Sequence, residues 1–184
     1  MLDAQYELVK EYIKIEKFPE PVWDMRLKIN QLRFKGFLFR IIEELSEAQE
    51  SLLENDITNF WTEIADSMAF ALEIGIVSGI LPGRDLWALA FIPRIAPANY
   101  DYSTVREWFW ESTYQLGMVS NVLRSKEWKQ TEVLPDMEKF KELMQDFYRT
   151  YFNGFSKIGC SEAHIVEWYL KKNAVNVFRQ RSKY

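Results

Sequence analysis

Two pairs of acidic residues, each with a spacing of three, are the clearest chemical feature of this sequence. Glu44 and Glu47 form one pair, in EELSE, and Glu63 and Asp66 form the other, in EIAD. Each residue of a helix turns by about 100°, so residues three apart share a face. On consecutive antiparallel helices, the four carboxylates would converge and could not all stay ionised without a cation. Such hard oxygen ligands suit Mg²⁺, with Mn²⁺ as a substitute.

These pairs have two other interpretations. Both pairs could be solvated surface, since Glu is a common helix former, but Phe60, Ile64 and Met68 make the second helix mostly apolar. A carboxylate is costly there and more often has a function. A di-iron site needs Glu-x-x-His from each of two helices. It is excluded because the sole histidine is His164, with Ser161 three residues before it.

A stripe of hydrogen-bond donors lies near the C-terminus. Lys172, Asn176 and Arg179 are spaced by four and three residues, which places them on one side of a helix. Such donors suit a polyphosphate, and arginine can bind two oxygens at once. The alternative is an ordinary basic last turn favoured by the helix dipole. Together with the acidic pairs, the stripe fits a nucleoside triphosphate bound through Mg²⁺.

The remaining sequence predicts one all-α domain over residues 1–184, a helical bundle with a four-helix core plus extra helices and no β-sheet. Gly and Pro number only 7 and 6 and bunch together, which leaves long helical segments. No sustained alternating pattern indicates a strand. The first expected helix is capped by Asp3 and runs through YELVKEYIKIEK, residues 6–17. The other expected helices cover residues 22–54 (as one helix or two), 57–77, part of 84–102, 103–123, 135–152 and 162–180.

Composition narrows the class of protein further. Apolar residues make up 48% of the 184 residues, enough for a substantial core. The charge of 23 − 27 = −4 argues against general nucleic-acid binding. The apolar stretch 68–81 contains Glu73 and is short of the roughly 20 residues of a membrane span. With a single cysteine, Cys160, and no signal-peptide pattern at the start, we expect a soluble cytoplasmic protein.

The motifs resemble those of a known superfamily. E44-L-S-E47, fifteen intervening residues and E63-I-A-D66 are similar to the ExxE…ExxD signature of all-α nucleoside triphosphate pyrophosphatases, the MazG and dimeric dUTPase superfamily. The ending YLKKNAVNVFRQRSKY resembles the Y-x-x-K-N-x-x-N-x-x-R-Q-x-x-G-Y tail of dimeric dUTPases and phage dCTP/dUTP pyrophosphatases. The two motifs span residues 44–66 and 169–184, about a fifth of the chain.

The resemblance implies a Mg²⁺-dependent enzyme that converts a deoxypyrimidine triphosphate, dUTP first and dCTP second, to the monophosphate and pyrophosphate. Glu47 is the carboxylate expected to orient or deprotonate the attacking water. The resemblance also implies a homodimer. If the chain is phage-encoded, the expected location is the host cytoplasm. The implied metal ligands are Glu44, Glu47, Glu63 and Asp66, and the implied phosphate ligands are Lys172, Asn176, Arg179 and Tyr184.

The base pocket is the part least fixed by the motifs. Lys183 replaces the usual glycine before the last tyrosine, and Ala69 stands where dimeric dUTPases often carry histidine. A purine or modified nucleotide, or a non-catalytic adaptor, therefore stays open. Trp61 and Phe70 could stack on the base or fill the core. Gln115, Asn121 and Trp128 are candidates to recognise the edge of the base. The alternative is that the two amides lie on a helix surface and the tryptophan lies in the core.

Overall fold

The computed structural model describes residues 1–16, 21–83 and 101–182, and within these ranges the chain forms helices and no strand. The all-α prediction is confirmed there, whereas the short helix expected within 84–102 lies outside the described residues. The helices are α1 (Leu2–Glu16), α2 (Lys28–Leu53), α3 (Ile57–Ser78), α5 (Tyr102–Val122), α6 (Met137–Lys157) and α7 (Glu162–Arg181).

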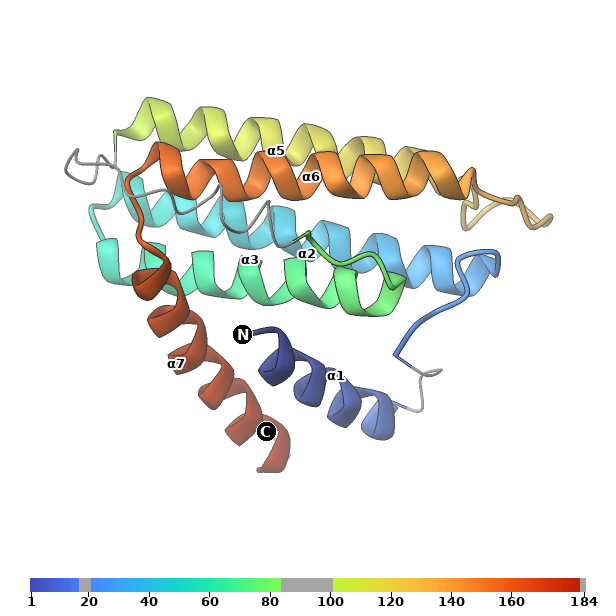
Figure 1. Cartoon of the computed structure of the whole chain (residues 1–184), viewed down its shortest axis with the longest axis horizontal. Coiled ribbons are helices and arrows are strands. Elements are labelled where there is room, and N and C mark those ends of the chain that lie inside the picture. The colour runs from blue at the N-terminus through green and yellow to red at the C-terminus, as the bar shows by residue number, and fades with distance from the viewer. Residues whose placement is uncertain (17–20, 84–100, 183–184) are drawn as a thin grey trace.

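Four of these helices form a bundle, and the other two lie against one side of it (Figure 1). α2 packs along α3, α5 packs along α6, and α2 also contacts α5. α1 and α7 cross the outer side of α3 and contact each other. α3 is therefore enclosed by helices from both parts of the fold, which places its polar residues between α2, α1 and α7.

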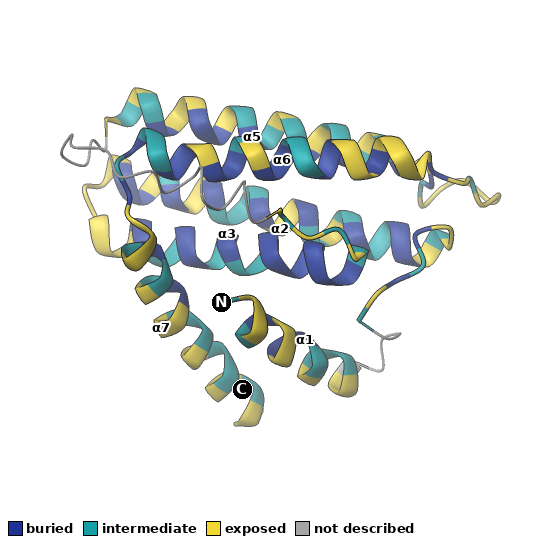
Figure 2. Cartoon of the chain, viewed as in Figure 1, coloured by how far each residue is buried: buried dark blue, intermediate teal, exposed yellow. Residues whose placement is uncertain are grey.

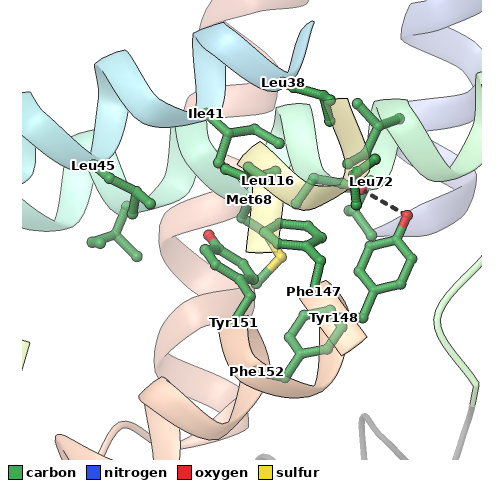
Figure 3. Packing of buried hydrophobic residues seen from close by; sticks show 14 of the residues in the cluster. Leu38, Ile41, Leu45, Met68, Leu72, Leu116, Phe147, Tyr148, Tyr151 and Phe152 are labelled. Carbon is green, nitrogen blue, oxygen red and sulfur yellow. Dashed lines mark hydrogen bonds between the residues drawn. The ribbon is translucent and has the colours of Figure 1, made fainter. Parts of the chain in front are cut away.

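The core lies between the two layers of the bundle (Figure 3). Leu38 and Ile41 of α2 and Met68 of α3 meet an aromatic row on α6, in which Phe147 and Tyr151 stack with ring centroids 5.5 Å apart. Buried residues run along most of α3, while α1 and α7 turn exposed faces outward (Figure 2). Burial on this scale holds α3 rigidly in place.

The turn between α2 and α3 sets the alignment of the acidic pairs. The Asp56 carboxylate accepts a hydrogen bond from the Asn59 backbone N–H at 2.9 Å, as expected for a helix N-cap. Glu44 lies nine residues before the end of α2, and Asp66 lies nine after the start of α3. In antiparallel neighbours with so short a connection, these two positions come to the same level of the bundle.

The helix starts differ from the sequence-based expectations in several places. α1 begins at Leu2, so Asp3 lies in its first turn. α2 begins at Lys28 instead of residue 22, because the preceding chain is tied to α3 by a 2.7 Å hydrogen bond from the Trp23 N–H to the Val77 carbonyl. α5 begins at Tyr102, one residue earlier than expected, and is capped by Asp101.

The end of α6 was also placed wrongly, because Gly154 does not stop the helix. α6 continues to Lys157, and Gly154 lies inside it against the indole of Trp108. A Cβ at this position would come within 1.9 Å of Trp108 atoms. The glycine therefore permits the close approach of α5 and α6, which the Trp108 indole N–H strengthens by donating to the Tyr151 carbonyl at 2.9 Å.

None of the helices in the described ranges combines the length and apolar character needed to cross a lipid bilayer.

Candidate active site

The structure brings together three carboxylates from the two acidic pairs. Glu44 of α2 and Glu63 and Asp66 of α3 each offer an oxygen, and these oxygens lie within 4.8 Å of one another. All three side chains are half-buried. Three anionic oxygen ligands at this spacing match the donors that a hard divalent cation prefers.

Glu47 lies beside this cluster without joining it. It stands one turn beyond Glu44 on α2, and its side chain is exposed. Its charge nevertheless raises the pKa of both Glu44 and Glu63. Glu47 is therefore close enough to act on groups bound at the cluster, although its carboxylate points into solvent.

Burial, with mutual repulsion as a smaller cause, raises the pKa of the carboxyls in this cluster. Burial, followed by the charges of Asp66, Glu47 and Glu63, raises the pKa of Glu44 to about 8. Burial also raises the pKa of Glu63 and of Asp66. A hydrogen bond joins Glu44 to Glu63. At neutral pH a proton held between Glu44 and Glu63 therefore reduces the negative charge of the cluster, which a bound cation would otherwise neutralise.

The donor stripe of α7 faces the same cluster. The Lys172 ammonium lies 2.6 Å from Oδ2 of Asp66. Asn176 hydrogen-bonds to Asp66, and the charge of Arg179 reaches it as well; all three interactions lower the pKa of Asp66 against the larger effect of burial. Helix α7 thus presents its donors to the carboxylates of α3, as the crossing of these helices requires (Figure 1).

A cavity of about 420 Å³ opens beside Asp66, between helices from both parts of the fold. It combines carboxylates and cations with three aromatic rings, those of Tyr12, Phe37 and Phe70. Its lining residues are Gln5, Leu8 and Tyr12 of α1, Phe37, Arg40 and Glu44 of α2, Asp66, Ala69, Phe70 and Glu73 of α3, and Asn176 and Arg179 of α7.

Of the candidates for the base pocket, Phe70 alone lines this cavity. Trp61 is buried in the core with its ring edge-on to His164, at a centroid distance of 4.4 Å. Gln115 and Asn121 lie on α5, which packs against α6 and α2 away from α1 and α7. Within one chain, the structure therefore does not bring these three residues to the cavity.

The two remaining candidates are Trp128 and Tyr184. Trp128 is exposed in the segment after α5, outside the cavity lining. Tyr184 lies outside the described residues. The contact expected between Trp128 and the base, and the contact that the resemblance implies for Tyr184, thus stay predictions.

Several lining residues were not anticipated from the sequence. Gln5 is only 1% exposed, and its side-chain oxygen accepts a hydrogen bond from the Tyr169 hydroxyl at 2.8 Å. Arg40 lies one turn before Glu44. Glu73 did carry a signal, because it interrupts an apolar stretch two helical turns after Asp66. The residues of α1 carried none, since their position depends on how that helix crosses α3.

Comparison with known proteins identifies the family of the chain. A family model described as dUTPase matches residues 53–184, more than two thirds of the chain. The match includes the carboxylates of α3 and the donors of α7 and begins after Glu44 and Glu47. No curated protein and no solved structure matches the chain significantly. With its all-helical fold, the chain belongs to the dUTPase family, within the superfamily of all-α nucleoside triphosphate pyrophosphatases.

Proposed function

We propose that this protein hydrolyses deoxypyrimidine triphosphates, dUTP first and dCTP second, to the nucleoside monophosphate and pyrophosphate, with Mg²⁺ as cofactor. The observation that carries the proposal is the meeting of the α2 and α3 carboxylates with the donors of α7 beside one cavity. An anionic substrate bound through a cation needs both sets of groups at once. Membership of the dUTPase family supports the same chemistry.

Glu44, Glu63 and Asp66 would hold the divalent cation, Mg²⁺ or Mn²⁺, since their oxygens are anionic and close together. When bound, such a cation supplies charge neutralisation on the phosphates and a more acidic water. Glu47 would orient the attacking water and take up its proton, because it stands exposed beside the cluster.

Lys172, Asn176 and Arg179 would hold the phosphates. Lys172 and Asn176 engage Asp66 in the substrate-free chain, so their donors already face the place where phosphate oxygens would lie. Arg179 lines the cavity and would bind two phosphate oxygens at once. This arrangement would stabilise negative charge on the triphosphate as it is cleaved.

The base would lie further along α3, beside Phe70. This ring lines the cavity one turn after Asp66, so it would stack on a pyrimidine whose phosphates lie at the carboxylates. We further propose that the protein acts as a homodimer, as the resemblance to dimeric dUTPases implies, and that Tyr184 closes over the nucleotide.

Release of pyrophosphate from a panel of the common dNTPs and NTPs, with Mg²⁺ and with EDTA, tests the proposal. We expect release from dUTP and more slowly from dCTP, abolished by EDTA and by Asp66→Asn. Preference for a purine triphosphate would contradict the pyrimidine assignment. Absence of release from the whole panel would contradict the enzymatic function and favour an adaptor. Near-normal turnover of Glu47→Gln would remove Glu47 from the mechanism.

A further inference from the structure

One buried carboxyl in the cavity has no part in the chemistry described so far. Glu73 of α3 is 5% exposed and lines the cavity together with Asp66 and Arg179. In the described ranges its carboxyl forms no ion pair or hydrogen bond, and burial is what shifts its pKa, to about 8. A buried polar group without a partner is costly. A carboxyl kept in this position next to a cavity therefore points to a ligand that supplies the partner.

The position of Glu73 relative to Asp66 fits the length of a nucleotide. Seven residues separate the two, which places them on the same face of α3 about 10 Å apart along the helix. Ala69 and Phe70, between them, also line the cavity. This span is comparable to the distance from the α-phosphate to the far edge of the base in a nucleotide. With the phosphates at Asp66 and the ring beside Phe70, the edge of the base would reach Glu73.

Two phenols that feel the charge of Glu73 do not satisfy its carboxyl. Burial, together with the charge of Glu73, raises the pKa of Tyr12 of α1 and of Tyr169 of α7. The Tyr169 hydroxyl donates to Gln5 at 2.8 Å and accepts from Asn173 at 3.3 Å, and Tyr12 hydrogen-bonds to Gln180. Among the described residues no cation is paired with Glu73, and burial keeps its carboxyl protonated at neutral pH.

We propose that Glu73 is a specificity-determining residue that recognises the hydrogen-bonding edge of a pyrimidine base as a neutral carboxyl. Its hydroxyl would donate to a ring acceptor while its carbonyl oxygen accepts from the adjacent N–H. In uracil these groups are O4 and N3–H, and in cytosine they are N3 and the amino group. The proton can sit on either oxygen, so one side chain serves both bases. The inference rests on the proposed function and deepens it.

Two variants separate recognition of the base from support of the fold. Glu73→Gln keeps one donor and one acceptor in nearly the same shape, whereas Glu73→Leu keeps similar bulk without either. The measured quantity is kcat/KM for pyrophosphate release from dUTP divided by that for N3-methyl-dUTP, whose N3 carries no hydrogen. This ratio does not depend on the fraction of folded enzyme, so a variant that folds poorly still reports on recognition.

We expect the wild type and Glu73→Gln to favour dUTP by roughly tenfold to a hundredfold, the range for leaving a buried partner unsatisfied. In Glu73→Leu the ratio should fall to about one, because nothing remains that distinguishes the two bases. A ratio that stays high in Glu73→Leu, or that is already near one in the wild type, would overturn the role of Glu73. A wild type that releases no pyrophosphate from dUTP would instead overturn the proposed function, and base recognition with it.

Discussion

The Lys172 ammonium lies 2.6 Å from Oδ2 of Asp66, in an ion pair that joins α7 to α3 and leaves the two side chains only 19% and 15% exposed. The pair supplies the carboxylate cluster with a positive charge and fixes the donor stripe against it. A bound cation would replace Lys172 as the partner of Asp66, and a bound phosphate would replace Asp66 as the partner of Lys172. The position of α7 and the proposed binding chemistry therefore depend on the same two groups.

Replacement of Lys172 by Met should destabilise the metal-free protein. The variant removes the cation paired with Asp66, and leaving a largely buried hydrogen-bonding partner unsatisfied costs on the order of 1 to 3 kcal/mol. Mg²⁺ should restore part of the loss, because a cation at the cluster replaces the missing charge. Urea denaturation in EDTA and in Mg²⁺ measures both effects.

The adjacent residue offers a matched control for this prediction. Lys171 pairs with Glu167 at 2.7 Å, but both side chains are 61% exposed. Lys171→Met should therefore change the free energy of unfolding by less than about 0.5 kcal/mol, with or without Mg²⁺. Equal losses in the two variants would show that the Lys172–Asp66 pair has no special role.

Glu44→Gln should be more stable than the wild type without Mg²⁺ but should gain less stability than the wild type when Mg²⁺ is added. Without the cation, the folded wild type has to take up a proton at Glu44 at neutral pH, a cost that the amide does not carry, so the variant should melt above the wild type. With Mg²⁺ about a hundredfold above its Kd, the wild type should gain about 2.7 kcal/mol, or ~5 to 10 °C in Tm, and the variant should gain little. Calorimetric melts of both, with exposed Glu50→Gln as control, measure both differences. A variant that gains as much from Mg²⁺ as the wild type would exclude Glu44 as a ligand.

Arg179→Ala should weaken triphosphate binding and leave the fold intact. The Arg179 side chain lines the cavity while lying largely in solvent, so its removal costs little packing. Loss of charge-assisted hydrogen bonds should raise the Kd for α,β-imido-dUTP by roughly tenfold to a hundredfold. Arg181→Ala, two residues on and outside this cavity, serves as the control. Unchanged affinity in Arg179→Ala, measured by titration calorimetry, would refute its contact with the phosphates.

Gly154→Ala should be among the most destabilising single methyl additions in this chain. The new Cβ would lie 1.9 Å from Trp108 atoms, so the indole must move and α5 and α6 must separate. We expect a loss of about 2 kcal/mol or more. Gly117→Ala in α5, where nothing lies within 4 Å of the new Cβ, should instead stabilise by about 0.5 to 1 kcal/mol through helix propensity. A neutral Gly154→Ala in thermal melts would contradict the close packing of these helices.

The carboxylate cluster was predictable because it depends on local geometry. Two helices joined through a turn capped by Asp56 align Glu44 with Asp66 almost regardless of the rest of the fold. The same logic failed for Gly154, where glycine usually indicates a helix end. Gly154 lies within the helix because the Trp108 indole packs against it, and Trp108 is far away in the sequence.

Contacts between distant segments limited prediction of the base pocket. Gln115 and Asn121 have suitable side chains, but their helix packs on the other side of the bundle. Gln5 and Tyr12 reach the cavity only because α1 crosses α3, which no spacing within α1 reveals. Glu73 was visible as a charge in an apolar stretch. Its meaning depended on finding it buried and facing the same cavity as Asp66.

Glu73→Gln should stabilise the protein by an amount that grows with pH. Burial raises the pKa of Glu73 to about 8 from 4.5, so between these values the folded chain holds a proton that the unfolded chain releases. The free energy of unfolding of the wild type therefore decreases as pH rises from 4.5 to 8 and then levels off. The amide carries no such penalty, so the advantage of the variant should be near zero at pH 4.5 and on the order of 4 kcal/mol at pH 8.

Urea denaturation of both proteins at pH 5, 6.5 and 8 measures this difference. The other buried carboxylates also titrate, but they are common to both proteins and cancel when the two are subtracted. Exposed Glu107→Gln on α5 controls for the change of one surface charge and should show no growth with pH. A constant difference between Glu73→Gln and the wild type would mean that Glu73 is ionised in the folded chain. In that state the side chain is an acceptor only and could not donate to a uracil carbonyl, so the same melts also test the base recognition assigned to it.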